Sequence, residues 1–274
     1  MQTETEGIVL RQVKTAANRT MLLIFSQKYG KISVGTGLTD RNSKSKSSLA
    51  IRPFTYGRYE LFKGREIYNL NGAEVRKSFY SFGENLDKYI TSSIALELTE
   101  KVLTEEVPEP RVFSLLLDFL NQMEKRTKSF DTLLIAYEVK LLNLLGHMPI
   151  LDNCVICGKK MDSVSVKTGI RFSVHDGGII CSNCNEEIHS KLAIDNVRNP
   201  EIFTEKPHST SYNQLIYDPK FDIVDTLRYL ADKPLSAFEK IALNESTADD
   251  LKAILREYFS YHLEVGPLKS ESMM

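Results

Sequence analysis

The sequence lacks the motifs by which many enzymes are recognised. Its 274 residues contain no G-x-x-x-x-G-K-[ST] phosphate loop, no G-x-S-x-G elbow, no H-E-x-x-H helix and no G-x-G-x-x-G loop. The five histidines are scattered, and acidic pairs such as Glu105-Glu106 and Asp249-Asp250 are interpreted as exposed helix ends. We therefore predict no catalytic residues and no enzymatic turnover.

Long hydrophobic runs are also missing. No stretch reaches the roughly 18 consecutive apolar residues that a membrane-spanning helix needs. We recognise no signal peptide before the first strand-like segment, no low-complexity tract and no internal repeat. These absences predict a cytoplasmic protein with no membrane segment.

Cysteine is scarce, but its placement is informative. The four cysteines form two Cys-x-x-Cys pairs, Cys154 with Cys157 and Cys181 with Cys184. Two such pairs can complete a tetrahedral thiolate shell, so we predict one structural zinc ion per chain. Gly158 permits the positive φ that such a turn often needs.

Other interpretations of the cysteines explain less. Two disulfides would need an oxidising compartment. A thioredoxin-like redox pair would account for one Cys-x-x-Cys but not for two. His175 or His189 lies close enough in sequence to replace one cysteine as a ligand.

Charge is distributed unevenly along the chain. Residues 1–80 carry 14 Lys or Arg against 6 Asp or Glu, whereas the remainder carries 21 against 30. This asymmetry predicts a basic N-terminal unit that faces a polyanion. A charged, solvated surface without a partner is the alternative.

Hydrophobic patterning predicts an α+β fold. Short strands with turns at regular spacing favour a five-stranded OB-fold barrel, with strands at residues 7–13, 20–26, 32–34, 54–61 and 66–70. Helical periodicity then predicts helices at residues 86–102, after Pro108 and Pro110, at 130–145 with Gly146 as cap, at 185–194, at 222–230 and from Thr247 to 266. Thr247 with Asp250 suggests a capping box.

These patterns predict four segments in the chain. We expect an OB-fold nucleic-acid-binding domain at 1–80, the first part of a helical domain at 81–150, an inserted four-cysteine zinc module at 151–186, and the second part of the helical domain at 187–274.

The barrel carries the main functional signal. OB-folds bind single strands with a cationic groove and with aromatic faces on which bases stack. The candidate DNA-binding cations are Arg11, Lys14, Lys31, Arg41, Lys44, Lys46, Arg52, Arg58, Lys63 and Arg65. The candidate rings are Tyr29, Phe54, Tyr56, Tyr59, Phe62 and Tyr68, although most of them could instead fill the barrel. Phe54, Tyr56 and Phe62 share one parity and Tyr59 has the opposite parity, so at least one of these two sets should face outward unless a bulge intervenes.

Several short segments are informative together: GIVL (7–10), KYGK (28–31), RPFTYG (52–57), LFKG (61–64), LLGHMP (144–149), LDNC (151–154), REY (256–258), HL (262–263) and LKS (268–270). In their order and spacing, these segments resemble the RecO family of bacterial recombination-repair proteins. The resemblance covers nearly the whole chain, and LLGHMP leading into LDNC is its most specific part.

The resemblance implies an OB-fold, a helical bundle and a zinc module. It also implies binding to single- and double-stranded DNA, annealing of complementary strands, and an association with the nucleoid. The expected partners are RecR, the C-terminal tail of single-strand-binding protein (SSB) and, indirectly, RecA. An acidic tail needs a cationic docking patch, for which the candidates are Arg126, Lys128, Lys140, Arg228 and Lys240.

Two other functions are compatible with the residues. A zinc-ribbon enzyme acting on nucleic acid would need a carboxylate cluster or an open zinc position. An RNA-binding OB protein is the other alternative, since no base-reading motif separates RNA from DNA.

Overall fold

The computed structural model describes residues 2–15, 20–37, 46–65, 67–161, 170–188 and 215–273. The chain divides into two units. Unit 1 comprises Met1–Leu144, Pro234–Ala242 and Pro267–Met274, and unit 2 comprises Leu145–Lys233 and Leu243–Gly266. The domain boundaries expected at residues 80, 150 and 186 stay predictions.

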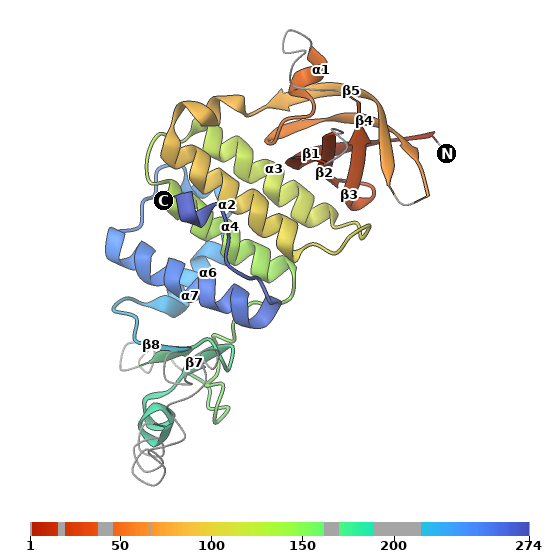
Figure 1. The fold of residues 1–274 in the computed structure, drawn as a ribbon. Helices are drawn as coiled ribbons and strands as arrows, with labels where there is room; N and C mark the ends of the chain where they lie inside the picture. Colours follow the sequence, from red (N-terminus) through yellow and green to blue (C-terminus); the bar gives the residue numbers. More distant parts are fainter. Residues whose placement is uncertain are drawn as a thin grey trace. The chain divides into compact units, whose positions relative to one another are not determined.

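Five strands of unit 1 form a closed barrel in the order β1-β2-β3-β5-β4 (Figure 1). They are β1 (Gln2–Lys14), β2 (Thr20–Ser26), β3 (Gly30–Thr36), β4 (Thr55–Lys63) and β5 (Tyr68–Ser78). Neighbouring strands are antiparallel except for β3 and β5, which are parallel. The predicted fold class, with an N-terminal OB-fold and C-terminal helices, is confirmed.

Strict alternation fills this barrel. Along β4, Tyr59 and Leu61 are fully buried, while Arg58, Glu60 and Phe62 face outward. The Tyr59 hydroxyl donates to the Ala50 carbonyl at 2.9 Å, so the polar end of this buried ring is satisfied. The sequence prediction ended the fifth strand at residue 70, but β5 continues to residue 78 because it pairs with β4 over its whole length.

The turn before β3 ties the barrel to the helical part of unit 1. Gly30 has φ +70°, and a Cβ there would lie 2.1 Å from the Val107 carbonyl oxygen, so only glycine fits. The Lys31 carbonyl accepts from the Glu106 N–H at 3.0 Å. The rings of Phe25 and Phe113 meet edge to face at 5.4 Å, which extends the barrel core onto the first turn of a helix.

Three helices follow the barrel in unit 1, and each starts or stops at a recognisable signal. After η2 (Tyr80–Glu84) come α2 (Leu86–Val102), α3 (Pro110–Lys125) and α4 (Phe130–Leu144). The Asn85 side chain caps α2 by accepting from the Lys88 N–H, and Pro110 occupies the first turn of α3. Gly146, at φ +77°, follows α4 as predicted.

A buried arginine fastens the returning segment η6 (Leu235–Phe238) to this bundle. Arg126 is only 5% exposed. Its guanidinium donates to the carbonyls of Ser129 at 2.8 Å, Phe238 at 2.5 Å and Ile241 at 2.7 Å. Arg126 was wrongly predicted as a docking cation, because its donors are already used inside the protein.

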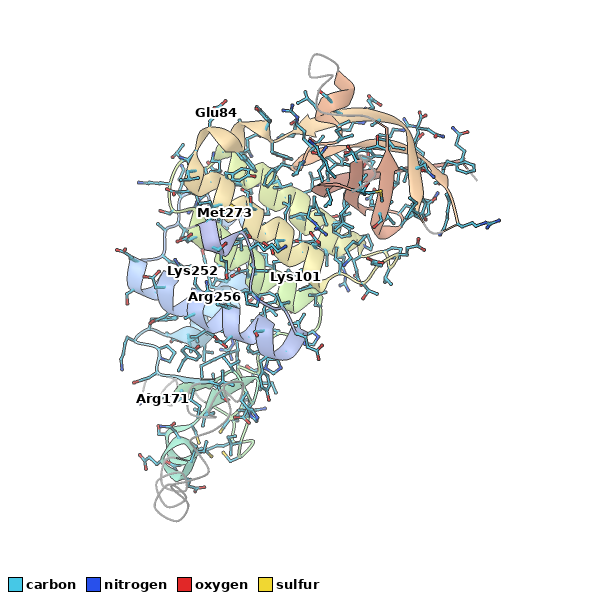
Figure 2. All side chains as sticks on the ribbon, in the orientation of Figure 1. Glu84, Lys101, Arg171, Lys252, Arg256 and Met273 are labelled. Carbon is cyan, nitrogen blue, oxygen red and sulfur yellow. The ribbon has the colours of Figure 1, made fainter. Side chains whose placement is uncertain are left out.

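The last segment of the chain, with η7 (Glu271–Met273), also packs in unit 1. The Glu97 carboxylate accepts from the N–H groups of Lys269 and Ser270, both at 2.9 Å, and from the Ser270 hydroxyl at 2.7 Å. Lys101, labelled with Met273 in Figure 2, donates to the Pro267 carbonyl at 3.3 Å. Polar contacts from α2 therefore hold this segment in place.

Unit 2 combines a small sheet with helices, among them a helical stretch at residues 182–188. Its elements are β6 (Arg171–Ser173), β7 (Gly178–Ile180), β8 (Ile216–Tyr217), α6 (Ile223–Asp232) and α7 (Glu245–Leu263). The sheet order is β7-β6-β8. The predicted capping box at Thr247 is wrong, because α7 begins two residues earlier and the Asn244 side chain caps it by accepting from the Thr247 N–H.

Candidate metal centre and nucleic-acid interface

The four cysteines come together at one point of unit 2. All their sulfur atoms lie within 4.8 Å of one another. Cys157 Sγ and Cys181 Sγ are 3.9 Å apart, close to the roughly 3.8 Å that tetrahedral zinc with 2.3 Å bonds would require. All four are free cysteines, so the disulfide alternative does not fit. The four cysteines are therefore positioned to bind a metal ion.

Local backbone bonds bring the two pairs together. The Gly158 N–H donates to the Cys154 carbonyl at 2.9 Å, and Gly158 has the predicted positive φ of 71°. The Val155 N–H donates to the Ile179 carbonyl at 2.9 Å, which aligns the first pair with β7. Residues 182–188 are helical, so the second pair spans the start of a helix directly after that strand.

The electrostatics of the sulfur cluster favour a cation. Burial raises the pKa of the Cys154 thiol, but hydrogen bonds from the backbone N–H groups of Cys157, Cys181 and Ile156 outweigh it and bring the pKa to about 7. Burial, followed by the neighbouring thiols, raises the pKa of Cys184 far above its usual value. Four thiolates cannot coexist so closely without a positive ion, and a bound metal would keep them deprotonated.

Of the two histidine alternatives, only His175 lies in the part of the chain that the structure describes, and it does not join this cluster. His175 contacts the Asp176 carboxylate at 3.1 Å and is not among the groups gathered around the sulfurs. His189 lies outside the described residues. Ile180 packs within the cluster, and Val155 and Met161 contact it from outside. This apolar packing restricts water around the sulfurs of Cys154 and Cys184, which are buried.

Two of the predicted DNA-binding cations are held by the helical part of unit 1. Lys31 Nζ donates to the Glu100 carbonyl at 2.7 Å. Arg11 forms an ion pair of 2.8 Å with the Glu100 carboxylate. Lys31 therefore has a structural role in joining the barrel to α2.

Two further cations form exposed ion pairs. Arg58 pairs with Glu4 across neighbouring strands, and Lys63 pairs with Glu106 at 3.2 Å. In each pair both side chains are at least two-fifths exposed. Such pairs contribute only about 0–1 kcal/mol, so a phosphate can compete for either cation.

Lys14 and Arg65 are the predicted cations most available to a ligand. Both side chains are exposed, and neither forms an ion pair with another described residue. Lys14 ends β1, where the loop to β2 begins, and Arg65 lies in the turn between β4 and β5. These two loops flank the face on which OB-folds bind oligonucleotides.

The remaining predicted cations divide into two groups. The Arg52 guanidinium lies 5.3 Å from the centre of the Tyr80 ring. Arg41 and Lys44 lie outside the described residues, as does the side chain of Lys46.

Most of the candidate rings fill the protein. Tyr59, Tyr68 and Phe54 are buried. Tyr56 packs edge to face against Phe113, and Tyr29 packs against Tyr68. Phe62 is 47% exposed and is the one candidate ring among the described residues that faces solvent, whereas Phe54 and Tyr56, which share its parity, are buried and half-buried.

Two basic residues of β5 were missing from the predicted set. Arg76 pairs with Glu74 at 3.0 Å, and Lys77 pairs with Glu124 at 2.7 Å. They were missed because the fifth strand was expected to end before them. Their own ion pairs make them weaker candidates than Lys14 or Arg65.

Among the helices that the structure describes, none is both long enough and apolar enough to cross a membrane.

Known families match the chain over most of its length. Residues 1–79 match Recombination protein O N terminal, and residues 83–196 and 220–272 match Recombination protein O C terminal. The chain is 32% identical over 265 residues to the DNA repair protein RecO of Alkaliphilus metalliredigens (strain QYMF), which covers 96% of this chain and 95% of that protein. It is 27% identical over 263 residues to the DNA repair protein RecO of Caldanaerobacter subterraneus subsp. tengcongensis, covering 96% and 93%. It is 31% identical over 194 residues to the DNA repair protein RecO of Bacillus pumilus (strain SAFR-032), covering 71% and 73%. The chain therefore belongs to the RecO family of DNA repair proteins.

Proposed function

We propose that this protein binds single- and double-stranded DNA through the phosphate backbone and anneals complementary single strands. The observation that carries the proposal is the placement of Lys14 and Arg65. These exposed cations, neither of them ion-paired with another described residue, lie at both loops that flank the ligand face of the barrel. With RecR, the protein would then help to load RecA onto DNA covered by SSB.

The small number of aromatic side chains that face solvent on the described barrel supports annealing. Two strands can pair only if their bases remain free. Met21 and Leu23 of β2 are half-buried on the ligand face, and Phe62 is the one outward candidate ring in the described barrel. A surface that holds phosphates and stacks few bases neutralises both backbones while base pairing supplies the sequence match.

We further propose that the ion at the cysteine cluster is one zinc and that it is structural. Four sulfur ligands suit zinc and leave no open position for a substrate. Cys154 and Cys184 are almost fully buried, so the ion would stabilise the fold of unit 2. The DNA would leave the protein covalently unchanged, which distinguishes this function from a nucleic-acid enzyme.

The proposed DNA function is tested by comparing matched DNA and RNA oligonucleotides at stated salt concentrations. Replacing Arg41, Lys44 and Lys46 together by alanine should weaken binding about equally for all sequences, because phosphates carry no sequence information. Wild-type affinity in this triple variant would remove the basic loop from the interface. Tighter binding of RNA than of DNA would favour the RNA-binding alternative, and cleaved oligonucleotide would favour an enzyme.

For the acidic tail of SSB, we propose docking on the helical part of unit 1. Arg228 is not a strong candidate, since it donates to the Leu151 carbonyl at 3.2 Å and pairs with Asp152. Lys128 and Lys240 are exposed. Reversing both charges to glutamate should weaken binding of a tail peptide, whereas unchanged binding would place the docking surface elsewhere.

A further inference from the structure

A pocket of about 380 Å³ lies within unit 1 between the barrel and the start of the helices. It is lined by Gln12 of β1, by Arg52 and Phe54 before β4, by Tyr80 of η2 and by Tyr89 of α2. Glu84, labelled in Figure 2, marks the end of η2. The volume is within the range of about 300–1,000 Å³ that is typical of small-ligand sites.

Two tyrosine rings of this pocket are exposed to solvent. Tyr80 is 64% exposed and Tyr89 is 38% exposed. The Arg52 guanidinium is 5.3 Å from the centre of the Tyr80 ring, and the Phe54 ring lies 5.7 Å from that of Tyr89. A flat ring beside a guanidinium is the arrangement on which proteins stack unpaired bases.

Gln12, which lines the pocket, carries an unsatisfied donor behind the pocket surface. Gln12 Nε2 is buried and has no hydrogen-bond partner among the described residues. Buried donors without a partner are rare, because they lose their hydrogen bonds to water without replacement. Turning the Gln12 side chain would bring this amide into the pocket, where an acceptor on a ligand edge would satisfy it, and glutamine amides commonly bond to base edges.

The backbone beside the pocket is strained. Phe54 adopts φ 66°, a left-handed conformation that is unusual for an aromatic residue. Its N–H donates to the Val9 carbonyl and its carbonyl accepts from the Phe79 N–H, both at 3.1 Å, so the conformation is held from both sides. Strained residues of this kind cluster at ligand-binding sites.

We propose that this pocket holds one unpaired nucleobase of a single strand, stacked on Tyr80 with its edge at Gln12. This proposal rests on the proposed binding of nucleic acid. Lys14 leaves β1 on the same side as Gln12, about 7 Å farther along the strand. Lys14 and Arg52 would therefore lie beside the adjoining phosphates. A paired base cannot enter, so the pocket would favour single strands over duplex.

The test uses the full chain and two single strands of equal length, one of thymidines and one with abasic sites in place of the bases. Wild-type protein should bind the thymidine strand more tightly. Tyr80→Ala should weaken that binding roughly 5- to 140-fold, the usual effect of losing one base–aromatic stack, and leave the abasic strand unaffected. Tyr80→Phe should retain wild-type binding because the ring remains.

Tyr229→Ala is the matched control. Tyr229 is 43% exposed and has the Lys233 ammonium 6.0 Å from its ring centre, so it resembles the Tyr80–Arg52 pair but belongs to unit 2. The Tyr229→Ala variant should bind both strands as the wild-type protein does. Gln12→Leu, which removes the donor and keeps the side-chain size, should also lower affinity for the thymidine strand alone.

The outcomes separate the two proposals. If Tyr80→Ala and Gln12→Leu bind both strands as wild type does, the base pocket is overturned while DNA binding stands. If wild-type protein binds neither strand, the proposed function fails, and the pocket proposal with it. If Tyr80→Ala weakens binding of an acidic peptide carrying an aromatic residue but not of DNA, the pocket serves a protein partner and the proposal is overturned.

Discussion

Replacing Lys14 and Arg65 together by alanine should weaken DNA binding and reduce its salt dependence. Both side chains are exposed and lack an ion pair with another described residue, so each can form an ionic contact with a phosphate without first leaving a carboxylate. The same change at Arg58 and Lys63 should weaken binding less, because these cations must first leave Glu4 and Glu106.

Counterion release gives the expected magnitude. Each phosphate contact contributes about 0.7 to the slope of log affinity against log salt for single strands, so the double variant should lose about 1.4. At 0.15 M salt, one contact corresponds to roughly a fourfold change in affinity and two to roughly 15-fold. Duplex DNA should show a slightly larger loss of slope, about 0.9 per contact.

Fluorescence anisotropy with a labelled single strand, measured from about 50 to 300 mM salt, would give both quantities. The control is Lys125→Ala with Lys128→Ala, which removes two exposed charges from the helical part of unit 1. A double variant of Lys14 and Arg65 that keeps the wild-type slope would refute the placement of the phosphate path on this face.

Three further predictions concern the fold and the metal. Arg126→Met should lower the free energy of unfolding by about 2–4 kcal/mol, because it removes the hydrogen bonds to three carbonyls, whereas Lys128→Met, at an exposed position, should change it by about 0.5 kcal/mol or less. Denaturant titration measures both free energies, and equal values would contradict the role of Arg126 in holding η6 against the helices. The Cys154→Ser variant should lose zinc and become sensitive to protease in unit 2. If metal analysis still finds one zinc per chain, the assignment of the cysteine cluster as the zinc site is contradicted. Burial raises the pKa of Glu97, but bonds from Ser270 and its neighbour lower it overall, so its stabilising effect is present above its unfolded pKa and is lost as the pH falls below about 4.5. Glu97→Gln should therefore reduce the acid-side loss of stability in urea titrations, and an unchanged pH profile would argue against this contribution.

Local signals in the sequence predicted much of the fold. The strand predicted at residues 20–26 matches β2 at both ends, and helical periodicity placed α2 from Leu86 to Val102. The predicted N-cap of α7 was wrong because Thr247 and Asn244 are both good cap formers, and only the backbone geometry selects between them.

The availability of the cations could not be predicted from the sequence. Glu100 and Glu106 hold Arg11, Lys31 and Lys63, but they come from α2 and the segment after it, far along the chain. Net charge counts all basic residues equally, whereas tertiary contacts decide which of them are already paired.

The proposed base pocket could not be predicted from the sequence either. Gln12 and Tyr80 belong to segments at opposite ends of the barrel sequence, and neither carries a motif. The ring count suggested an aromatic surface but not which rings would be exposed. The cysteine cluster was predictable because its spacing alone brings each pair to one ion.

The most direct test of the account is the annealing of two complementary labelled single strands by the full protein without nucleotide or Mg²⁺. We predict that the protein accelerates duplex formation, that the Lys14 and Arg65 double variant does so less, and that both strands are recovered at their original length and mass. Binding of both strands without acceleration, or recovery of cleaved or modified strands, would contradict a protein that brings strands together through their phosphates and leaves the pairing to the bases.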